Sequence, residues 1–337
     1  MSVNELSLVP LVSVIMPIRN EAKFITRSLG AVLSQSYPKQ RMEVIIADGL
    51  SSDNTIDIIR EMHTDVLVII IDNTGIKQAS GLNLAIQRAT GDVIVRVDGH
   101  TIVAPDYIEE CVRALEETGA ANVGGPMKPI GETLMGRAIA SAGKSPFAVP
   151  TPFHISDKPQ FTDTVYMGAW RRKTFEQIGF YNTEMPSNED YELNHRIIKR
   201  GGKIYLTPRI KSEYFGRQTL GSLARQYFNY GIGKVRMLSL YPESLKLRQV
   251  VAPTFVLYLV IGSVLSWLHP LLLAVWGAGV LAYMTLNLFF AFRQSVADHT
   301  SLWRISFAFL TIHLSWGTGF LVALGKNLYR SLTNLRS

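Results

Sequence analysis

The stretch GDVIVRVDGH, residues 91–100, indicates the fold class. Its apolar part, residues 93–97, is rich in β-branched residues and is followed by an aspartate, a glycine and a histidine. A near-continuous apolar strand is typical of a sheet that is covered on both faces. Because alternate residues of an extended chain point to the same side, Asp98 and His100 can reach one metal ion at the end of this strand.

Three apolar runs of the same kind precede this strand, and helical patterns alternate with them. We predict strands at 12–16, 44–47, 66–71 and 93–97, and helices near 22–35, 54–63, 76–89 and 106–118. Asp53 is expected to cap the second helix, and Gly91 to follow the third. Such alternation predicts an α/β fold with a mostly parallel sheet, helices on both faces, and ligands at the carboxyl ends of the strands.

The C-terminal part of the chain has the composition of membrane helices. Hydrophobic residues make up 47% of the chain and charged residues 18%, and residues 250–292 contain no Asp, Glu, Lys or Arg. This run is about twice the length that one spanning helix needs, and His269-Pro270 near its middle predicts a turn. The predicted transmembrane helices are about 250–268, 271–292 and 305–325. The third is alternatively re-entrant or interfacial, because three spans place the basic tail 326–337 outside.

Positive charge gathers just before the predicted spans. The formal net charge is +7, and residues 199–250 hold eleven Lys and Arg against two acids. Lys246 and Arg248 precede the first span, which places the N-terminal domain in the cytoplasm by the positive-inside rule. The single cysteine, Cys111, fits a reducing compartment, and we expect no signal peptide.

These patterns divide the chain into four parts. We predict a catalytic domain at 1–215, a basic amphipathic membrane-interface segment at 216–249, membrane helices within 250–325, and the basic tail. The Arg and Lys side chains of the interface segment are expected to face lipid rather than to bind a specific ligand. They are Arg217, Arg225, Lys234 and Arg236. Nucleic acid is disfavoured as a partner, because no motif for it is present.

Polar clusters follow three of the predicted strands, at residues 17–21, 48–55 and 98–100. Neither the G-x-G-x-x-G pattern of dinucleotide folds nor a P-loop is present. A carboxylate-held divalent cation is then the expected device for neutralising the phosphates of a ligand.

A further motif, SNEDYELNHRIIKRGG, begins at Ser187. Ser187 and Asp190 fit a capping box that opens a helix ending at Gly201-Gly202. Asp190 is also a candidate general base, because the positive end of a helix favours an ionised carboxylate. The two interpretations are compatible.

The segments VSVIMPIRNE, IIADGLSSDNT, GDVIVRVDGH, GAWRRKTFEQIGFYN and NEDYELNHRI occur in this order over residues 11–215. Together they resemble the family 2 inverting glycosyltransferases of GT-A fold. With ARQYFNYGIGK and HLSWGTGFL, the likeness extends to membrane-bound succinoglycan-type glucosyltransferases, which elongate a sugar on a polyprenyl diphosphate carrier during exopolysaccharide assembly.

The resemblance implies an enzyme that moves a single hexose from a UDP-sugar, with UDP-glucose as the expected donor, to a polyprenyl diphosphate-linked sugar. A processive relative would carry Q-x-x-R-W, which is absent. Localisation is expected in the plasma (inner) membrane as a multi-pass protein with the catalytic domain on the cytoplasmic face. The cofactor is a divalent metal, with Mn²⁺ preferred to Mg²⁺ because imidazole suits manganese better.

The resemblance also implies the site residues. Asp190 would be the catalytic base, and Asp98 with His100 would hold the metal. Alternatively, His100 contacts the diphosphate or acceptor and Asp98 alone anchors the ion. The nucleotide-sugar residues would be Pro17, Glu21, Asp48, Lys77 and Asp98, with Asn83 supporting the loop of Lys77. The acceptor residues would be Glu189, Trp170, Arg225 and Gln226.

Other interpretations stay open from the sequence. Trp170 and two tyrosines, Tyr227 and Tyr230, fit membrane-interface anchors as well as sugar platforms. His313 is expected to pair with a neighbouring helix rather than to act in catalysis. The rival functions are transfer to polyprenyl monophosphate and a catalytically silent nucleotide-sugar-binding scaffold. The oligomeric state is not predicted.

Overall fold

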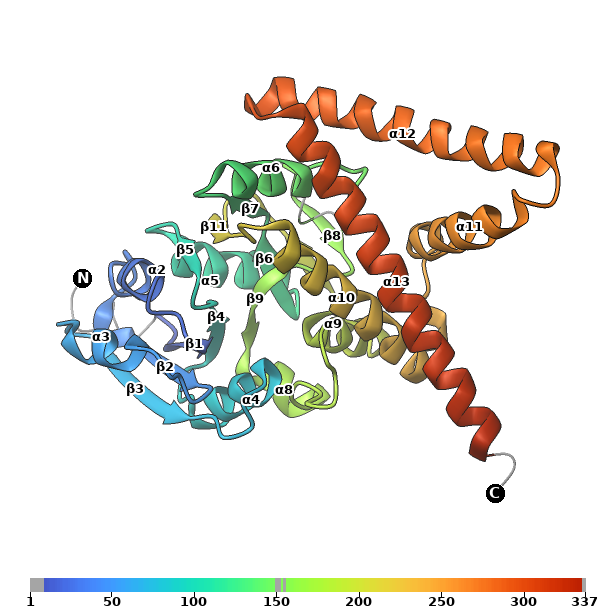
Figure 1. Ribbon diagram of the computed structural model, residues 1–337. Helices are drawn as coiled ribbons and strands as arrows, with labels where there is room; N and C mark the ends of the chain where they lie inside the picture. The colour runs from blue at the N-terminus through green and yellow to red at the C-terminus, as the bar shows by residue number, and fades with distance from the viewer. Residues whose placement is uncertain (1–8, 149–152, 154–155, 335–337) are drawn as a thin grey trace. The chain divides into compact units, whose positions relative to one another are not determined.

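A computed structural model describes residues 9–148, 153 and 156–334 (Figure 1). The chain forms two compact units. The first comprises Met1–Lys128, Pro152–Glu184 and Glu189–Phe215, and the second comprises Pro129–Thr151, Met185–Asn188 and Gly216–Ser337. Residues 129–148 lie inside the predicted catalytic domain 1–215, but they belong to the second unit.

The first unit is built on an eight-stranded sheet with the order β3-β2-β1-β4-β9-β6-β10-β8 (Figure 1). The first four strands pair in parallel. They are β1 (Val12–Ile18), β2 (Met42–Asp48), β3 (Leu67–Asp72) and β4 (Val93–Arg96). Each coincides with a predicted strand, because every residue of β1, β2 and β4 is buried and apolar side chains must therefore dominate both faces.

The other strands of the sheet are short, and β9 (Tyr166–Arg171) runs antiparallel between β4 and β6. The remaining members are β6 (Asn122–Gly125), β8 (Gln160–Thr162) and β10 (Ile204–Leu206). A second sheet has the order β5-β11-β7 and comprises β5 (Thr101–Val103), β11 (Ser212–Phe215) and β7 (Met127–Ile130). The predicted α/β fold with a mostly parallel sheet is confirmed, and β8 and β9 are its antiparallel members.

Helices cover both faces of the large sheet (Figure 1). One apolar cluster packs α2 (Ile25–Leu33), α3 (Thr55–Glu61) and α5 (Tyr107–Thr118) on one face. A second cluster packs α4 (Gln78–Arg88), α8 (Arg172–Ile178) and α9 (Glu189–Lys199) on the other. A short 3₁₀ turn, η1 (Lys39–Arg41), leads into β2.

One of the predicted helix caps is wrong. The residue that precedes α3 is Asn54, and Asp53 instead accepts the backbone N–H and the hydroxyl of Thr55. The hydroxyl of Ser187 donates to the carbonyl of Asn229 at 2.9 Å. Helix α9 begins at Glu189, and the capping role of Ser187 stays a prediction.

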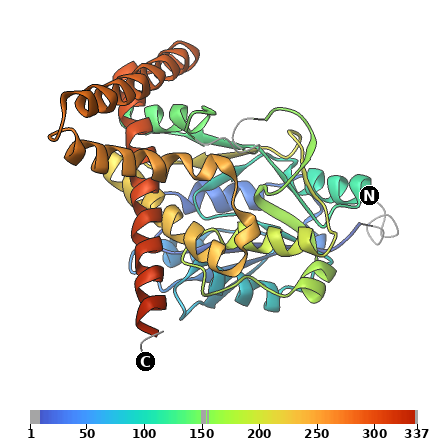
Figure 2. The same cartoon turned by 90° about the vertical axis from the view of Figure 1, so that its right-hand side faces the viewer.

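The second unit is helical. Its helices are α6 (Leu134–Gly143), α10 (Leu220–Leu240), α11 (Val251–Leu265), α12 (Pro270–Asp298) and α13 (Leu302–Asn334), with 3₁₀ turns η2 (Pro242–Ser244) and η3 (Leu247–Gln249). Figure 2 shows α13 as one long helix. It packs against α6, α10, α11 and α12.

Glycines allow α10 and α13 to approach closely. A Cβ on Gly231 would lie 2.3 Å from the carbonyl oxygen of Trp316, and one on Gly319 would lie 2.1 Å from that of Phe228. Small residues at a crossing let two helix backbones approach, as in membrane helix pairs.

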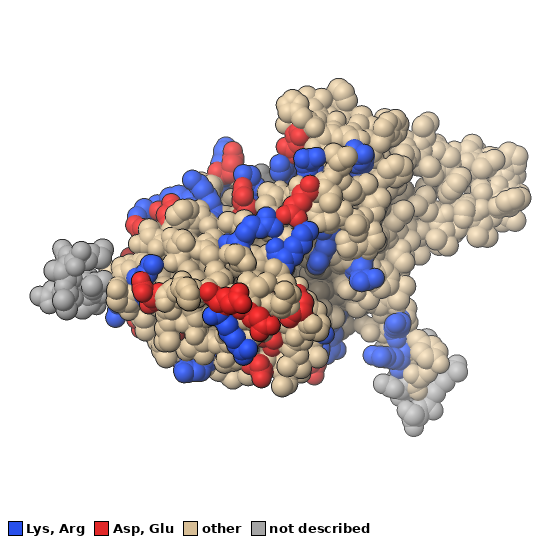
Figure 3. All heavy atoms as spheres, turned by 60° about the vertical axis from the view of Figure 1, so that its left-hand side comes forward, with Lys and Arg blue, Asp and Glu red and all other residues tan. Residues whose placement is uncertain are grey.

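Three helices of the described chain are long and apolar enough to cross a membrane: Leu247–Leu265, Pro270–Asp298 and Leu302–Arg330. The predicted turn at His269-Pro270 is present, and His269 accepts the N–H of Leu271. The third segment is continuous, which argues against the re-entrant alternative. A wide region of the surface in Figure 3 shows no charged side chains, consistent with the exposed apolar residues of α11 and α12.

Two polar residues in the helical unit have partners inside it. His313 lies 2.9 Å from the hydroxyl of Tyr283 and 2.9 Å from the carbonyl of Phe147, so the predicted pairing with a neighbouring helix is confirmed. Lys234 was expected to face lipid, and this is wrong: it is 3% exposed and its amino group donates to the carbonyl and hydroxyl of Ser244. These two acceptors compensate the buried charge. The distribution of charges along the sequence does not show that Lys234 has them.

Candidate active site

The carboxyl ends of β1, β2 and β4 lie side by side, because these strands pair in parallel and in matched register. Ile18 at the end of β1 pairs with Asp48 at the end of β2, and Ile15 pairs with Arg96 at the end of β4. The strand order reverses between β1 and β4, and ligands of open α/β sheets bind at such a reversal. The polar segments that follow the three strands therefore begin at one edge of the sheet.

Asp48 and Pro17 belong to the strands themselves. Pro17 lies within β1 opposite Ala47, where both residues are buried. The Asp48 carboxylate accepts the N–H of Ser51 at 3.0 Å and its hydroxyl at 2.5 Å. These two hydrogen bonds fold the loop after β2 back over its own aspartate.

Lys77 and Asn83 fasten the loop that follows α8. The amino group of Lys77 donates to the carbonyl of Thr183 at 3.1 Å. The amide of Asn83 donates to the carbonyl of Tyr181 and accepts its N–H, at 2.8 and 2.9 Å. Asn83 was expected to support the loop of Lys77; its amide instead forms two hydrogen bonds with the loop after α8.

A buried ion pair connects the end of β4 with the start of α9. Arg96 is 4% exposed and Asp98 is 6% exposed. The Arg96 Nε and Nη2 atoms donate to the two carboxylate oxygens of Asp98 at 2.7 and 3.2 Å. Nη2 also lies 3.7 Å from Oε1 of Glu189. The Arg96 guanidinium therefore contacts both Asp98 of the D-G-H segment and Glu189 of the E-D pair.

The E-D pair occupies the first turn of α9. Glu189 is buried, whereas Asp190 keeps some contact with solvent. Burial raises the pKa of Glu189 to about 7, and the neighbouring Asp190 adds to the rise. Burial also raises the pKa of Asp190, while the Arg96 guanidinium opposes that rise. Two carboxylates with raised pKa values beside a buried cation are typical of a proton-transfer site.

His100, two residues after Asp98, contacts Glu21. Its Nδ1 is 2.8 Å from Oε1 of Glu21. Its ring also meets Tyr214 edge-on, with 5.1 Å between the ring centroids. Glu21 was expected to lie against the nucleoside, and in the structure its carboxylate holds an imidazole.

The predicted acceptor residues are scattered. Trp170 is 1% exposed and packs against Phe175 and Tyr181, so its ring belongs to the core and offers no surface for a sugar. Arg225 and Gln226 lie on α10 of the helical unit, where the Gln226 amide donates to the hydroxyl of Tyr230 at 3.0 Å. Their acceptor roles stay predictions.

Sequence reasoning missed two residues of this edge. Arg96 is the more important, and its signal was a charged residue inside an otherwise apolar strand, where it must be paired. Gln78, at the start of α4, has its amide nitrogen 3.5 Å from Oδ1 of Asp98. No sequence pattern distinguished Gln78 from an ordinary helix residue.

Within the described residues, no cluster of three or more His, Cys, Asp or Glu side chains could hold a metal ion. Asp98 and His100 are the residues that would hold an ion at this edge, together with the oxygens of a bound diphosphate. One carboxylate and one imidazole fit a manganese-type cation that binds together with a nucleotide.

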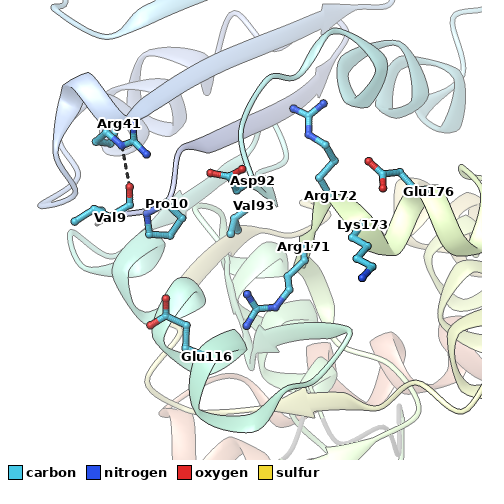
Figure 4. A pocket seen from close by; sticks show the side chains of 10 residues that line it. All are labelled: Val9, Pro10, Arg41, Asp92, Val93, Glu116, Arg171, Arg172, Lys173 and Glu176. Atoms are coloured by element: carbon cyan, nitrogen blue, oxygen red, sulfur yellow. Dashed lines mark hydrogen bonds between the residues drawn. The ribbon is translucent and has the colours of Figure 1, made fainter. Parts of the chain in front are cut away.

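A cavity of about 560 Å³ lies elsewhere in the first unit, around the amino ends of β1 and β4 (Figure 4). It is lined by both signs of charge: Arg41, Asp92, Glu116, Arg171, Arg172, Lys173 and Glu176. The Arg172 guanidinium is held by the carbonyls of Ala89 and Gly91. These contacts tie strand ends together at the edge opposite the candidate site.

The fold is that of a GT-A glycosyltransferase. The chain matches the Glycosyl transferase family 2 over residues 13–179. A putative glycosyltransferase EpsE from Bacillus subtilis is 36% identical over 228 residues, which is 66% of this chain and 78% of that protein. The protein belongs to glycosyltransferase family 2.

Two further relatives match at 29% identity. The succinoglycan biosynthesis protein ExoA from Rhizobium meliloti aligns over 91% of this chain and 93% of its own length. A dolichyl N-acetyl-alpha-D-glucosaminyl phosphate 3-beta-D-2,3-diacetamido-2,3-dideoxy-beta-D-glucuronosyltransferase from Methanococcus voltae aligns over 67% of this chain and 74% of its own.

Among solved structures, the mannosyltransferase PcManGT from Pyrobaculum calidifontis, in complex with GDP-Man and Mn²⁺, is similar in fold. Its TM-score is 0.61 at 19% identity, with 94% of this chain and 87% of that chain covered. The similarity confirms the GT-A fold.

Proposed function

We propose that the protein transfers a single sugar from a UDP-sugar to a lipid-linked sugar, with inversion at the anomeric carbon. The observation that carries this proposal is the Arg96 bridge between Asp98 and Glu189. It places the D-G-H segment, where the donor diphosphate is expected, next to the E-D pair, where the acceptor is expected.

Asp190 acts as the general base. Asp190 keeps contact with solvent, so an acceptor hydroxyl can reach it, whereas Glu189 is buried. Asp190 takes the proton of the hydroxyl as that oxygen forms a bond to the anomeric carbon. The bond from that carbon to the diphosphate breaks on the opposite face, so the configuration inverts and UDP leaves with the bonding electrons.

Asp98 and His100 are the residues that would hold a divalent cation. Such a cation supplies charge neutralisation to the leaving diphosphate, so no acid is required on the donor side. Arg96 orients the Asp98 carboxylate, because its two N–H groups match the two carboxylate oxygens.

A lipid-linked acceptor is supported by the three apolar helices that are long enough to span a bilayer. It is supported also by the relative from Methanococcus voltae, whose name specifies a dolichyl phosphate sugar, and by the succinoglycan biosynthesis protein. The catalytic unit faces the cytoplasm in this proposal, with Lys246 and Arg248 at the headgroup layer before the first span.

UDP-glucose is the proposed donor, and it is tested beside other nucleotide sugars. Purified full-length protein in detergent or nanodiscs is incubated with Mn²⁺, a panel of UDP- and GDP-sugars, and three acceptors: polyprenyl monophosphate, polyprenyl monophosphate-linked sugar and polyprenyl diphosphate-linked sugar. Nucleoside diphosphate release and the lipid product are both measured.

We expect release above background only with a UDP-sugar and only with a lipid that already carries a sugar. Sugar transfer to bare polyprenyl monophosphate would replace the proposed acceptor by the simpler one. Absence of both hydrolysis and transfer with every donor, in protein that still binds UDP, would support a silent binding subunit.

A further inference from the structure

Glu21 makes a contact that a nucleoside-binding role does not explain. Its carboxylate oxygen lies 2.8 Å from Nδ1 of His100, and the two side chains are only partly exposed, at 14% and 25%. An imidazole and a carboxylate at this distance share one hydrogen bond. The bond joins the segment after β1 to the segment after β4.

Gly99 accommodates this contact. A Cβ on Gly99 would lie 2.9 Å from Cγ of Glu21, 3.2 Å from its Cδ and 3.0 Å from a methyl group of Ile18. Any larger residue in the middle of D-G-H would therefore displace the Glu21 side chain. The carbonyl of Gly99 accepts a hydrogen bond from the hydroxyl of Ser28 at 2.6 Å.

The backbone of Glu21 is anchored by the segment after β2. Its N–H donates to the hydroxyl of Thr55 at 2.8 Å, and that hydroxyl donates to the Asp53 carboxylate at 2.5 Å. The same carboxylate accepts the N–H of Ala22 at 3.2 Å. Asp53, read from the sequence as a helix cap, thus supports the turn that carries Glu21.

His100 is restrained from its other sides. The N–H of Phe215 donates to its carbonyl at 3.1 Å, and the ring of Tyr214 stands edge-on to the imidazole. With Nδ1 committed to Glu21, the ring nitrogen that remains for a ligand is Nε2.

We infer that Glu21 is a positioning residue that accepts the Nδ1–H of His100 and so presents Nε2, as an electron-pair donor, to a cation bound with the donor diphosphate. A metal-ligating histidine commonly donates its other ring N–H to a carboxylate, which fixes both tautomer and orientation. This inference rests on the proposed function for the identity of the nucleotide ligand. It replaces the predicted contact of Glu21 with the nucleoside.

The test measures Mn²⁺ binding directly, without an acceptor. Full-length protein is titrated with Mn²⁺ in the presence of UDP, the affinity is read from the free-Mn²⁺ EPR signal, and pulsed EPR of the bound ion reports a coordinated imidazole nitrogen. The variants are Glu21→Ala, Glu21→Gln and His100→Asp. The matched control is Glu117→Gln, which removes an exposed carboxylate paired with Arg209.

We expect a nitrogen coupling in the parent, in Glu117→Gln and in Glu21→Gln, whose amide oxygen can still accept the Nδ1–H. Glu21→Ala should weaken Mn²⁺ affinity about 10–100-fold, the usual effect of losing such a partner. His100→Asp should abolish the nitrogen coupling and shift preference toward Mg²⁺. Thermal unfolding of each variant shows whether it is folded, and Glu21→Gln keeps the test informative where Glu21→Ala is not.

Two results would overturn the inference: no nitrogen coupling in the parent, or an unchanged Mn²⁺ affinity in Glu21→Ala with a loss of UDP affinity instead. The second result would return Glu21 to the nucleoside. A parent that binds Mn²⁺ through nitrogen but transfers no sugar in the acceptor assay would contradict the proposed function and leave the role of Glu21 intact.

Discussion

At the scale of single residues, Arg96 is the group on which the candidate site depends most. It is a fully enclosed guanidinium between Asp98 and Glu189. Breaking a buried ion pair by removing one partner typically costs about 3–5 kcal/mol, because the other charge stays buried without compensation. When Arg96 is removed, the neighbouring carboxylates can lower this cost by taking up protons. The same change therefore affects both the stability of the site and its activity.

Arg96→Met should therefore lower the midpoint of thermal unfolding and move the acid limb of the activity profile to higher pH. The direction follows because Arg96 lowers the pKa values of both Glu189 and Asp190. Arg96→Lys should be intermediate, since lysine keeps the charge but cannot form the two-pronged contact. Unchanged unfolding and an unchanged profile in Arg96→Met would show that the guanidinium is dispensable.

The pH dependence of the parent enzyme follows from the same pair. A general base works only when deprotonated, and a raised pKa means that the deprotonated form is lost at a higher pH than for an ordinary carboxylate. Because the pKa of Glu189 is raised to about 7 and that of Asp190 is also raised, transfer should fall as the pH drops below neutrality. Initial rates at saturating Mn²⁺ across this range test the expectation; a rate that stays level well into the acid range would contradict it.

Most candidate residues could be predicted from the sequence, but the side chains that they contact could not. Asp98, Asp190 and His100 stand out because polar residues after apolar strands or at a helix start are unusual in type and spacing. Which side chain Glu21 would meet could not be read, because its partner is 79 residues away and the contact depends on strand register. Trp170 fitted a sugar platform from its motif, yet residues 167–170 of β9 are all buried, so its ring lies in the core.

At the scale of elements, the long apolar strands and the membrane helices were predictable, and the short strands were not. β1, β2 and β4 are buried on both faces, so their composition is distinctive. β9 contains Gly168 and has positive φ at Met167, which weakens the strand pattern. The packing of residues 129–148 within the helical unit was missed because α6 resembles any amphipathic helix until its neighbours are known.

The crossing of α10 and α13 gives a prediction with an internal control. Gly231→Ala places a Cβ 2.3 Å from the Trp316 carbonyl, so the helices must separate, and overpacking of this kind typically costs about 1–3 kcal/mol. Gly221→Ala, in the same helix with nothing within 4 Å, should be neutral or stabilise by up to about 1 kcal/mol. Thermal unfolding in one detergent compares the two; equal midpoints would mean that the crossing is not tight.

At the scale of the whole molecule, three apolar helices predict an integral membrane protein. Membrane fractions washed with high salt or alkaline carbonate should retain the full-length chain, because apolar spans are not screened by ions. Release of intact protein into the wash would mean that the basic residues, rather than α11 to α13, hold it at the membrane.

The central claim is that this family 2 glycosyltransferase uses Asp190 as its base, and Asp190→Asn tests it most directly. UDP affinity and sugar transfer to the lipid-linked acceptor are measured on the same preparation, beside Asp57→Asn, which alters an exposed pair with Arg60. We predict unchanged UDP binding and a loss of transfer of about 10²–10⁴-fold in Asp190→Asn, the usual contribution of a general base, and parent-like behaviour in the control. An Asp190→Asn protein that keeps more than half of the parent's transfer rate would contradict the account.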